Sequence, residues 1–113
     1  MLNIAVLVSG GGTNLQALLD SEARGENPNG RITLVVASKP GVYALERAAK
    51  AGVEGVVVRR KDYESSEDFD AALLNQLKTH HIDLVVLAGF LSVLGPSVIA
   101  AYPRRILNVH PAL

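Results

Sequence analysis

Short apolar runs alternate with helix-like patterns along the chain, and this alternation constrains the fold more than any other feature. Runs typical of strands buried on both faces occur at residues 3–8, 32–37, 55–58, 82–88 and 105–109. Helical spacing lies between them, at residues 15–24, 42–51, from Ser65 onward, and from Gly95-Pro96 to Pro103. Strand and helix repeated with short connections predict parallel strands and right-handed crossovers. We therefore expect an α/β protein with a doubly wound sheet, which binds ligands beyond the carboxyl ends of its strands.

Each of the first three predicted helices has an apolar face that should pack against the sheet. Ser65 is the expected N-cap of the third helix, with Asp68 as its reciprocal partner. The residues expected to face inward are Leu15, Leu18 and Leu19 in the first helix, Val42, Leu45 and Ala49 in the second, and Phe69, Leu73 and Leu77 in the third.

Composition excludes several classes of function. The 113 residues carry eleven basic and eleven acidic side chains, so no net charge favours nucleic acid or a membrane surface. Cysteine is absent, which excludes disulfides and thiol catalysis and favours a reducing compartment. No signal peptide or membrane-length apolar run is visible in the sequence. We expect a single domain of a cytoplasmic protein.

The segment Ser9-Gly10-Gly11-Gly12-Thr13-Asn14 joins the first strand to the first helix. The free amides of a helix N-terminus and the positive end of its dipole attract anions. Glycines allow the backbone to approach phosphate oxygens closely, and Thr13 and Asn14 add side-chain donors. The pattern favours a phosphate site, while a tight strand-to-helix turn without a ligand is the alternative.

Two familiar phosphate motifs are absent from this loop. The dinucleotide fingerprint requires a third glycine where this chain has Leu15, and an acidic residue where it has Ser38-Lys39. The Gly-Lys-Ser/Thr of nucleoside triphosphatases does not occur. The loop therefore fits a single phosphate, and a dinucleotide oxidoreductase is disfavoured.

Asn108 and His110 stand two residues apart at the end of the last predicted strand, and so on one face. An amide can donate to a developing oxyanion, and an imidazole can move a proton near neutral pH. This pair suits transfer of an acyl-level group to an amine, although a structural polar pair would look the same.

Two further segments are less decisive. Residues 89–94 (GFLSVL) are apolar where a surface loop would be polar, and either core packing or the wall of a slot for a flat ligand explains them. His80 and His81 end a predicted helix, where histidine interacts well with the dipole. The sequence offers no further ligands beside them, so we expect structural roles and no metal site.

The chain resembles the folate-dependent formyltransferase family, and within it the glycinamide ribonucleotide formyltransferases. The matching segments are VLVSGGGTNLQAL, ALERAAKAGV, DLVVLAGFL and RRILNVHPAL, in the family order over all 113 residues. The start Ser-Gly-x-Gly-Thr/Ser-Asn is specific within the superfamily. The resemblance implies a Rossmann-like sheet with strand order 3-2-1-4-5, truncated after strand five.

The resemblance also implies roles for individual residues. Gly12, Thr13 and Asn14 would bind the substrate phosphate, and Asn108 and His110 would be catalytic. Leu91, Val93 and Leu94 would form the wall for the pterin ring. The implied reaction is formyl transfer from 10-formyltetrahydrofolate, as co-substrate, to the amine of glycinamide ribonucleotide in purine biosynthesis.

The chain departs from the family in two respects. Ser66 and Ser92 stand where the family often has arginines that can serve the folate tail. The family also continues after NVHPAL into a C-terminal section with a catalytic Asp. We therefore expect residues 1–113 to be the N-terminal, phosphate-binding part of a formyltransferase domain, inactive alone. A non-catalytic phosphate-binding module and a related formyl-transfer or hydrolase enzyme are the alternatives.

Overall fold

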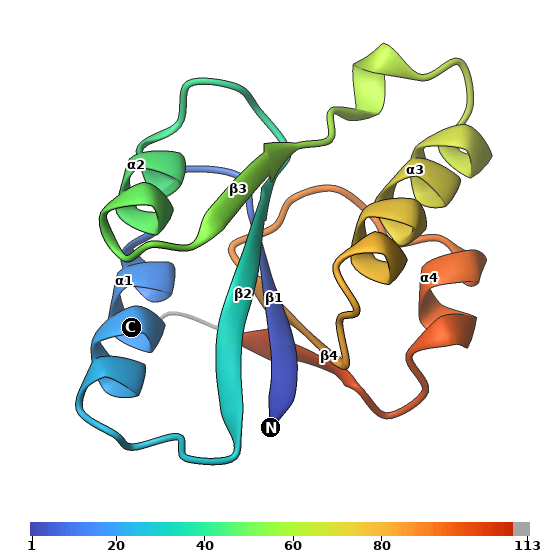
Figure 1. Cartoon of the computed structure of the whole chain (residues 1–113). Helices are drawn as coiled ribbons and strands as arrows, with labels where there is room; N and C mark the ends of the chain where they lie inside the picture. Colours follow the sequence, from blue (N-terminus) through green and yellow to red (C-terminus); the bar gives the residue numbers. More distant parts are fainter. Residues whose placement is uncertain (110–113) are drawn as a thin grey trace.

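The computed structural model describes residues 1–109, which form a parallel sheet between two pairs of helices (Figure 1). The strands lie in the order β3-β2-β1-β4-β5, as the resemblance predicts. The elements are β1 (Leu2–Val8), α1 (Thr13–Ala23), β2 (Gly30–Ala37), α2 (Tyr43–Lys50), β3 (Glu54–Val57), the 3₁₀ helix η1 (Arg60–Asp62), α3 (Ser66–Thr79), β4 (Leu84–Ala88), α4 (Pro96–Ala101) and β5 (Ile106–Val109).

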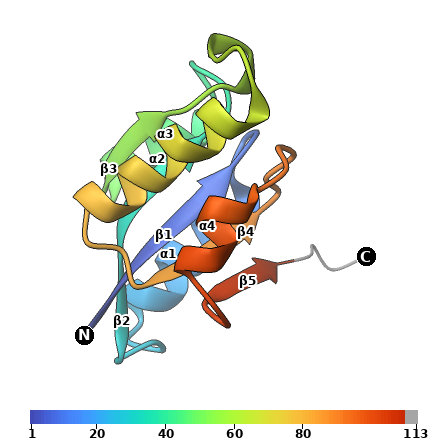
Figure 2. The same ribbon diagram turned by 90° about the vertical axis from the view of Figure 1, so that its right-hand side faces the viewer.

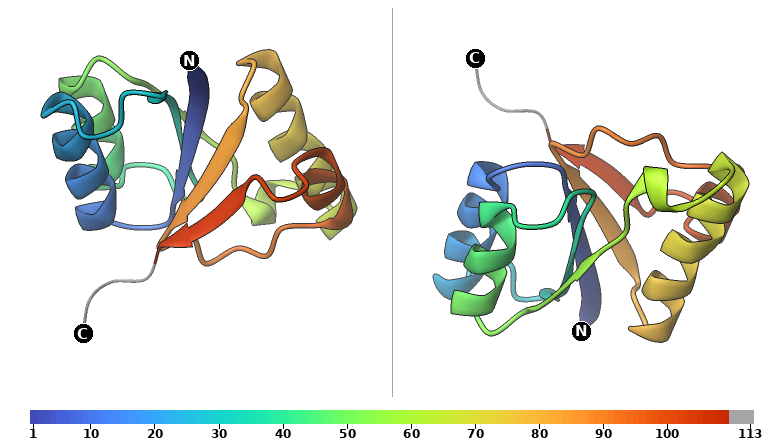
Figure 3. Two further views of the ribbon diagram at one scale, coloured as in Figure 1. Left: turned by 90° about the horizontal axis from the view of Figure 1, so that it is seen from below. Right: turned by 90° about the horizontal axis from the view of Figure 1, so that it is seen from above.

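The helices cover the sheet in pairs, and each pair closes one core. Figure 3 shows α1 and α2 on one side of the sheet and α3 and α4 on the other. Successive side chains of a strand point to opposite faces, so β1 contributes to both cores. Ile4, Val6 and Val8 pack on the α1/α2 side, whereas Ala5 and Leu7 pack on the α3/α4 side. The strands are therefore buried on both faces, which explains their unbroken apolar runs.

The register between β1 and β2 shifts at one residue. Ile4 pairs with Ile32, but Ala5 pairs with Leu34, so Thr33 is the extra residue of a bulge. Its Oγ1 is buried without a hydrogen-bond partner among the described residues. The shift puts Ile32 and Leu34 in opposite cores, an arrangement that simple alternation along the strand does not predict.

The inward faces of the helices agree with the sequence except in α2. Leu15 and Leu19 of α1, and Phe69, Leu73 and Leu77 of α3, are all buried, and Leu18 packs against the first core. In α2 the expectation for Ala49 was wrong, because it is exposed while Ala44 and Ala48 are fully buried. Val42 and Leu45 lie at the border of the core. The smallest side chains face inward because α2 packs closely against the start of α1.

Side chains accept hydrogen bonds from the backbone amides at the starts of both α3 and α4. Ser65 caps α3 as predicted, its Oγ accepting from the amide of Asp68 at 3.1 Å. Asp70, only 2% exposed, accepts from the amides of Gly95 and Ser97 at 2.9 and 2.8 Å. The start of α4 is therefore held by a buried carboxylate of α3. Within residues 1–109, no helix is long and apolar enough to cross a membrane.

Candidate functional site

In doubly wound sheets the ligand crevice lies where the strand order reverses, which in this sheet is between the carboxyl ends of β1 and β4. The chain leaves β1 toward α1 on one face of the sheet, and leaves β4 toward α4 on the other face (Figure 3). Doubly wound sheets bind ligands where neighbouring connections diverge in this way. Two of the segments singled out in the sequence, the glycine loop and residues 89–94, follow these two strands directly, and the end of β5 lies one strand farther along the same edge.

The glycine loop presents the free amides of α1. Helix α1 starts at Thr13, and the amide of Gln16 makes the first internal bond, to the carbonyl of Gly12 at 2.8 Å. The preceding amides of the helix have no intrahelical partner, and no side chain caps this end. Acidic residues are also absent from the first turn. The positive end of the dipole is thus uncompensated, which favours an anion.

The three glycines differ in how strongly the fold requires them. Gly12 has φ +81°, and a Cβ there would lie 2.8 Å from Cβ of Ala44. Its absent side chain therefore serves the packing of α1 against α2. Gly10 and Gly11 have no atom within 4 Å of a Cβ position, so the space beside them is open to a ligand. Close helix packing is a second reason for this loop that the sequence did not reveal.

Arg47 of α2 holds the glycine loop by hydrogen bonds from the α2 side. Its Nε donates to the carbonyl of Gly11 at 2.8 Å, and its Nη1 donates to Oε1 of Gln16 at 3.1 Å. The guanidinium also lies 4.6 Å from the ring centre of Tyr43. These contacts turn the loop carbonyl toward α2 and bring a cation beside the free amides. Sequence reasoning did not single out Arg47, which is 36 residues from Gly11.

A buried pair of serines joins three strand ends at the floor of the crevice. Ser38 Oγ donates to Ser9 Oγ at 2.6 Å, and the amide of Leu91 donates to the same Ser9 oxygen at 2.8 Å. Ser9 and Ser38 are 4% and 7% exposed. The connection after β4 is therefore attached directly to the residue that precedes the glycines.

The predicted folate residues are in different environments. Leu91 and Val93 are 80% and 85% exposed, which is unusual for large apolar side chains. Leu94 and Phe90 instead pack at the border of the α3/α4 core. The segment thus combines two core anchors with two apolar side chains that are open to solvent.

Asn108 lies on β5, an edge strand of the sheet among the described residues (Figure 2). It pairs in register with Leu87, one residue before the end of β4, and its side chain is exposed. Ile106 packs in the α3/α4 core, so Asn108 faces the same side two residues later. The pairing therefore places Asn108 next to β4, one of the two strands that border the crevice. His110, the other predicted catalytic residue, lies outside the described residues.

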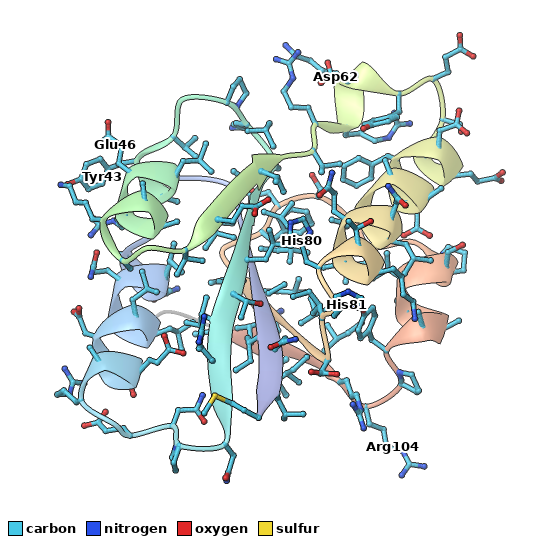
Figure 4. All side chains as sticks on the ribbon, in the orientation of Figure 1. Tyr43, Glu46, Asp62, His80, His81 and Arg104 are labelled. Carbon is cyan, nitrogen blue, oxygen red and sulfur yellow. The ribbon has the colours of Figure 1, made fainter. Side chains whose placement is uncertain are left out.

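His80 and His81 lie away from the crevice (Figure 4). His80 Nδ1 is 2.8 Å from the carbonyl of Gln76, and Nε2 is 2.8 Å from a carboxylate oxygen of Glu54. The hydrogen bond to Glu54, followed by that to Gln76, raises the pKa of His80. This histidine ties α3 to β3, in agreement with the structural role expected. The described residues contain no group of three or more His, Cys, Asp or Glu that could hold a metal ion.

The strand order and the flanking helices define a Rossmann-like α/β domain, and the family follows from the comparisons. The formyl transferase family matches residues 2–113, so the chain belongs to this family. Glycinamide ribonucleotide transformylase 1 from Symbiobacterium toebii has a similar structure, with TM-score 0.93 and 44% identity over 100% of this chain and 53% of that one. The corresponding protein of Geobacillus kaustophilus gives TM-score 0.92 and 42% identity, over 100% and 60%.

Curated relatives agree with these structures. Phosphoribosylglycinamide formyltransferase of Escherichia coli (strain K12) is 37% identical over 112 residues, which are 99% of this chain and 52% of the relative. The trifunctional purine biosynthetic protein adenosine-3 of Drosophila melanogaster is 42% identical, over 97% of this chain and 8% of the relative. The chain thus spans about half of the single-function relative and a small part of the trifunctional one.

Proposed function

We propose that the chain provides the ribonucleotide-phosphate half of a phosphoribosylglycinamide formyltransferase, with Gly12, Thr13 and Asn14 at the phosphate. The observation that carries this proposal is the glycine loop: its free helix amides face the crevice between β1 and β4, and a bound phosphate oxygen can accept from them. The open space beside Gly10 and Gly11 is compatible with a bound phosphate, and the titration below distinguishes this site from a ligand-free turn.

The reaction we propose is formyl transfer to the primary amine of glycinamide ribonucleotide. The co-substrate 10-formyltetrahydrofolate supplies the formyl group. The amine nitrogen attacks the formyl carbon, the bond from that carbon to the folate nitrogen breaks, and one amine proton passes to that nitrogen. Asn108 donates its side-chain N–H to the oxyanion of the tetrahedral intermediate. His110 assists this stabilisation and the proton movement.

The exposed side chains of Leu91 and Val93 support a site for the pterin ring beside these groups. A flat apolar ring laid against them would remove apolar surface from water. Leu94 completes the predicted wall from its more buried position. These side chains lie on the segment that Ser9 attaches to the phosphate loop, so both substrates would meet at the crevice.

The relatives continue beyond the length of this chain, and the resemblance places a catalytic Asp in their C-terminal section. We propose that residues 1–113 are the phosphate-binding part of the domain and alone bind folate weakly, with little or no transfer. An apolar hollow of about 360 Å³ beside β5, lined by Leu18, Val86 and Leu107 among others, offers a surface for further chain to cover. The cytoplasmic location expected from the sequence remains a prediction.

An amide-correlation NMR titration with glycinamide ribonucleotide tests this function. We expect shifts concentrated at residues 10–14, and the same residues should respond to ribose 5-phosphate but not to glycinamide. Dispersed peaks that do not move would contradict the phosphate site. Binding without transfer in a formyl-transfer assay agrees with a half-site, whereas near-normal turnover would disprove the inactivity we propose.

A further inference from the structure

A side chain of α2 sets the direction of the peptide group between Gly11 and Gly12. Arg47 Nε donates to the carbonyl of Gly11 at 2.8 Å, so this carbonyl points at the guanidinium. No peptide bond within residues 1–109 is cis, and in a planar trans peptide the N–H points opposite to the C=O. The N–H of Gly12 therefore points away from Arg47, and no backbone carbonyl of the described residues accepts from it.

Packing does not hold the Gly11 side of this peptide. Glycine adopts backbone angles of either hand at similar cost, and Gly11 meets no atom within 4 Å of a Cβ position. If the peptide rotated by half a turn, a carbonyl oxygen would replace the N–H on the side that faces away from Arg47. An anion binds where successive backbone N–H groups converge, and a carbonyl oxygen repels it. The affinity of the loop for an anion therefore depends on which way this one peptide points.

The guanidinium of Arg47 is itself held on both sides. Its Nη1 donates to Oε1 of Gln16 at 3.1 Å, and its centre lies 4.6 Å from the ring centre of Tyr43, which is labelled on α2 in Figure 4. Gln16 is fixed in turn, because its Nε2 donates to Oδ1 of Asp20 at 2.9 Å. Within residues 1–109, no carboxylate lies within ion-pair distance of Arg47. Neutral groups of α1 and α2 thus determine where the guanidinium lies.

This arrangement uses the shape of an arginine side chain as well as its charge. The planar guanidinium directs two N–H groups at two acceptors in fixed directions, which the single ammonium of a lysine cannot reproduce. One of these N–H groups is bound to the loop and the other to α1. The side chain therefore fixes the loop relative to the helix whose free amides it precedes.

We propose that Arg47 is a positioning residue for phosphate binding, which keeps the N–H of Gly12 directed at the anion. This inference rests on the proposed function, because it requires the phosphate to lie at Gly12, Thr13 and Asn14. Arg47 acts through the loop, since the two N–H groups described above are taken by Gly11 and Gln16. Without it, the peptide would sample both directions, and the apparent affinity would fall by the fraction of molecules that hold the competent one.

The test measures the binding of ribose 5-phosphate to the full chain and to three variants by amide-correlation NMR titration. R47M removes both hydrogen bonds and the charge, whereas R47K keeps the charge but not the paired donors. K50M is the matched control, because it removes a cation from the same helix. Lys50 Nζ donates to the hydroxyl oxygen of Tyr43 at 3.2 Å and not to the loop.

We expect R47M to bind ribose 5-phosphate roughly fivefold more weakly, which corresponds to a competent peptide direction about a fifth of the time. R47K should lose roughly threefold, and K50M less than about 1.5-fold, because one exposed charge contributes little. The Gly12 amide should also change its chemical shift in ligand-free R47M, while the amides of α1 from Gln16 onward stay where they are. This second readout shows that the helix is intact and that the loop peptide has changed.

Three outcomes would overturn the positioning role. R47K could bind as tightly as the original chain while R47M does not, which would mean that the charge acts without the paired hydrogen bonds. K50M could lose as much as R47M, which would mean that any cation of α2 has the same effect. The Gly12 amide could keep its chemical shift in R47M, which would mean that Arg47 does not set the direction of the peptide.

The same titrations separate this inference from the proposed function. If ribose 5-phosphate shifts no amide of residues 10–14 in the original chain, the phosphate site is wrong and the role of Arg47 falls with it. If ribose 5-phosphate binds there and R47M binds it equally tightly, only the role of Arg47 is wrong and the proposed function stands.

Discussion

The glycine loop and the segment of residues 89–94 lie on either side of one crevice, yet the protein holds them in different ways. On the α2 side of the loop, Gly12 packs too closely against Ala44 to leave room for a Cβ, and Arg47 donates a hydrogen bond to the carbonyl of Gly11. The 89–94 segment is attached at Leu91 N and by core anchors, but the side chains of Leu91 and Val93 extend into solvent.

This difference separates residues needed for folding from residues needed for a ligand. A substitution in the packed loop changes both stability and any phosphate site formed there. The exposed side chains of the other segment contribute little to the stability of the folded state. Any role that they have must therefore come from binding a ligand. The predictions below test this separation, beginning with the largest expected change in the free energy of unfolding.

Gly12→Ala should have the largest effect. The new Cβ would lie 2.8 Å from Ala44 Cβ in a backbone with φ +81°, and strain and overpacking together cost about 2–4 kcal/mol. Urea unfolding measures the loss. Gly11→Ala is the matched control and should change stability by less than about 1 kcal/mol. Equal effects at the two positions would show that packing against α2 does not distinguish them.

Asp70→Ala should have the next largest effect, about 2 kcal/mol, because the amides of Gly95 and Ser97 lose their buried charged acceptor. It tests how far the 89–94 segment depends on its attachment to α3. Hydrogen exchange should accelerate at Gly95 and Ser97 more than at the hydrogen-bonded amides of α1, residues 16–23. Asp70→Asn keeps one acceptor oxygen and should lose about half as much; uniform acceleration in both regions would contradict local anchoring.

His80 gives a smaller, pH-dependent contribution at a site remote from both regions. Its pKa is raised above 6.5 in the folded state by Glu54 and then by the Gln76 carbonyl. The contribution is therefore complete below pH 6.5 and is lost as the pH rises through the folded-state pKa. Because Glu54 is largely exposed, we expect less than about 1 kcal/mol.

Urea unfolding of the original chain and H80Q at pH 5.5 and pH 9 measures this term. The difference between them should be larger at the lower pH, while ribonucleotide affinity should be the same for both at either pH. A change in ribonucleotide affinity in H80Q would mean that the hydrogen bond between α3 and β3 influences ligand binding at the crevice.

Leu91→Ser combined with Val93→Ser should have the smallest effect on stability, within about 0.5 kcal/mol. Pteroate affinity should nevertheless fall roughly tenfold, since the ring loses two apolar contacts. NMR titration and urea unfolding on the same samples give both quantities. Destabilisation of the same size as in Gly12→Ala would show that Leu91 and Val93 are needed for folding, which would contradict the separation between the two regions.

The strands of the sheet were well predicted from the sequence, because a strand buried on both faces appears as an unbroken run of apolar residues. All five strands were located, and Ser65 was recognised as a cap from its spacing to Asp68. In α2 Val42 and Leu45 pack against the core as predicted, but Ala49 was wrong. No local signal distinguished Ala49 from Ala44, which faces inward because it packs against Gly12. The bulge at Thr33 likewise depends on pairing between strands, which no single run displays.

The candidate site was only partly predictable. The glycines and Asn108 stand out by residue type, and strand order 3-2-1-4-5 is enough to locate the crevice. Arg47 and the pair of Ser9 and Ser38 could not be found, because each contact joins residues brought together by helix or strand packing.

The parallel arrangement also bears on how this unit can be combined with others. All strands direct their carboxyl ends to the edge that carries the crevice, whereas Met1, 83% exposed, lies at the other edge (Figure 1). Polypeptide joined ahead of Met1 would leave the molecule on the side away from the crevice and would not obstruct substrate entry. This geometry is compatible with fusion to other domains, and a similar sequence makes up 8% of a much longer trifunctional relative.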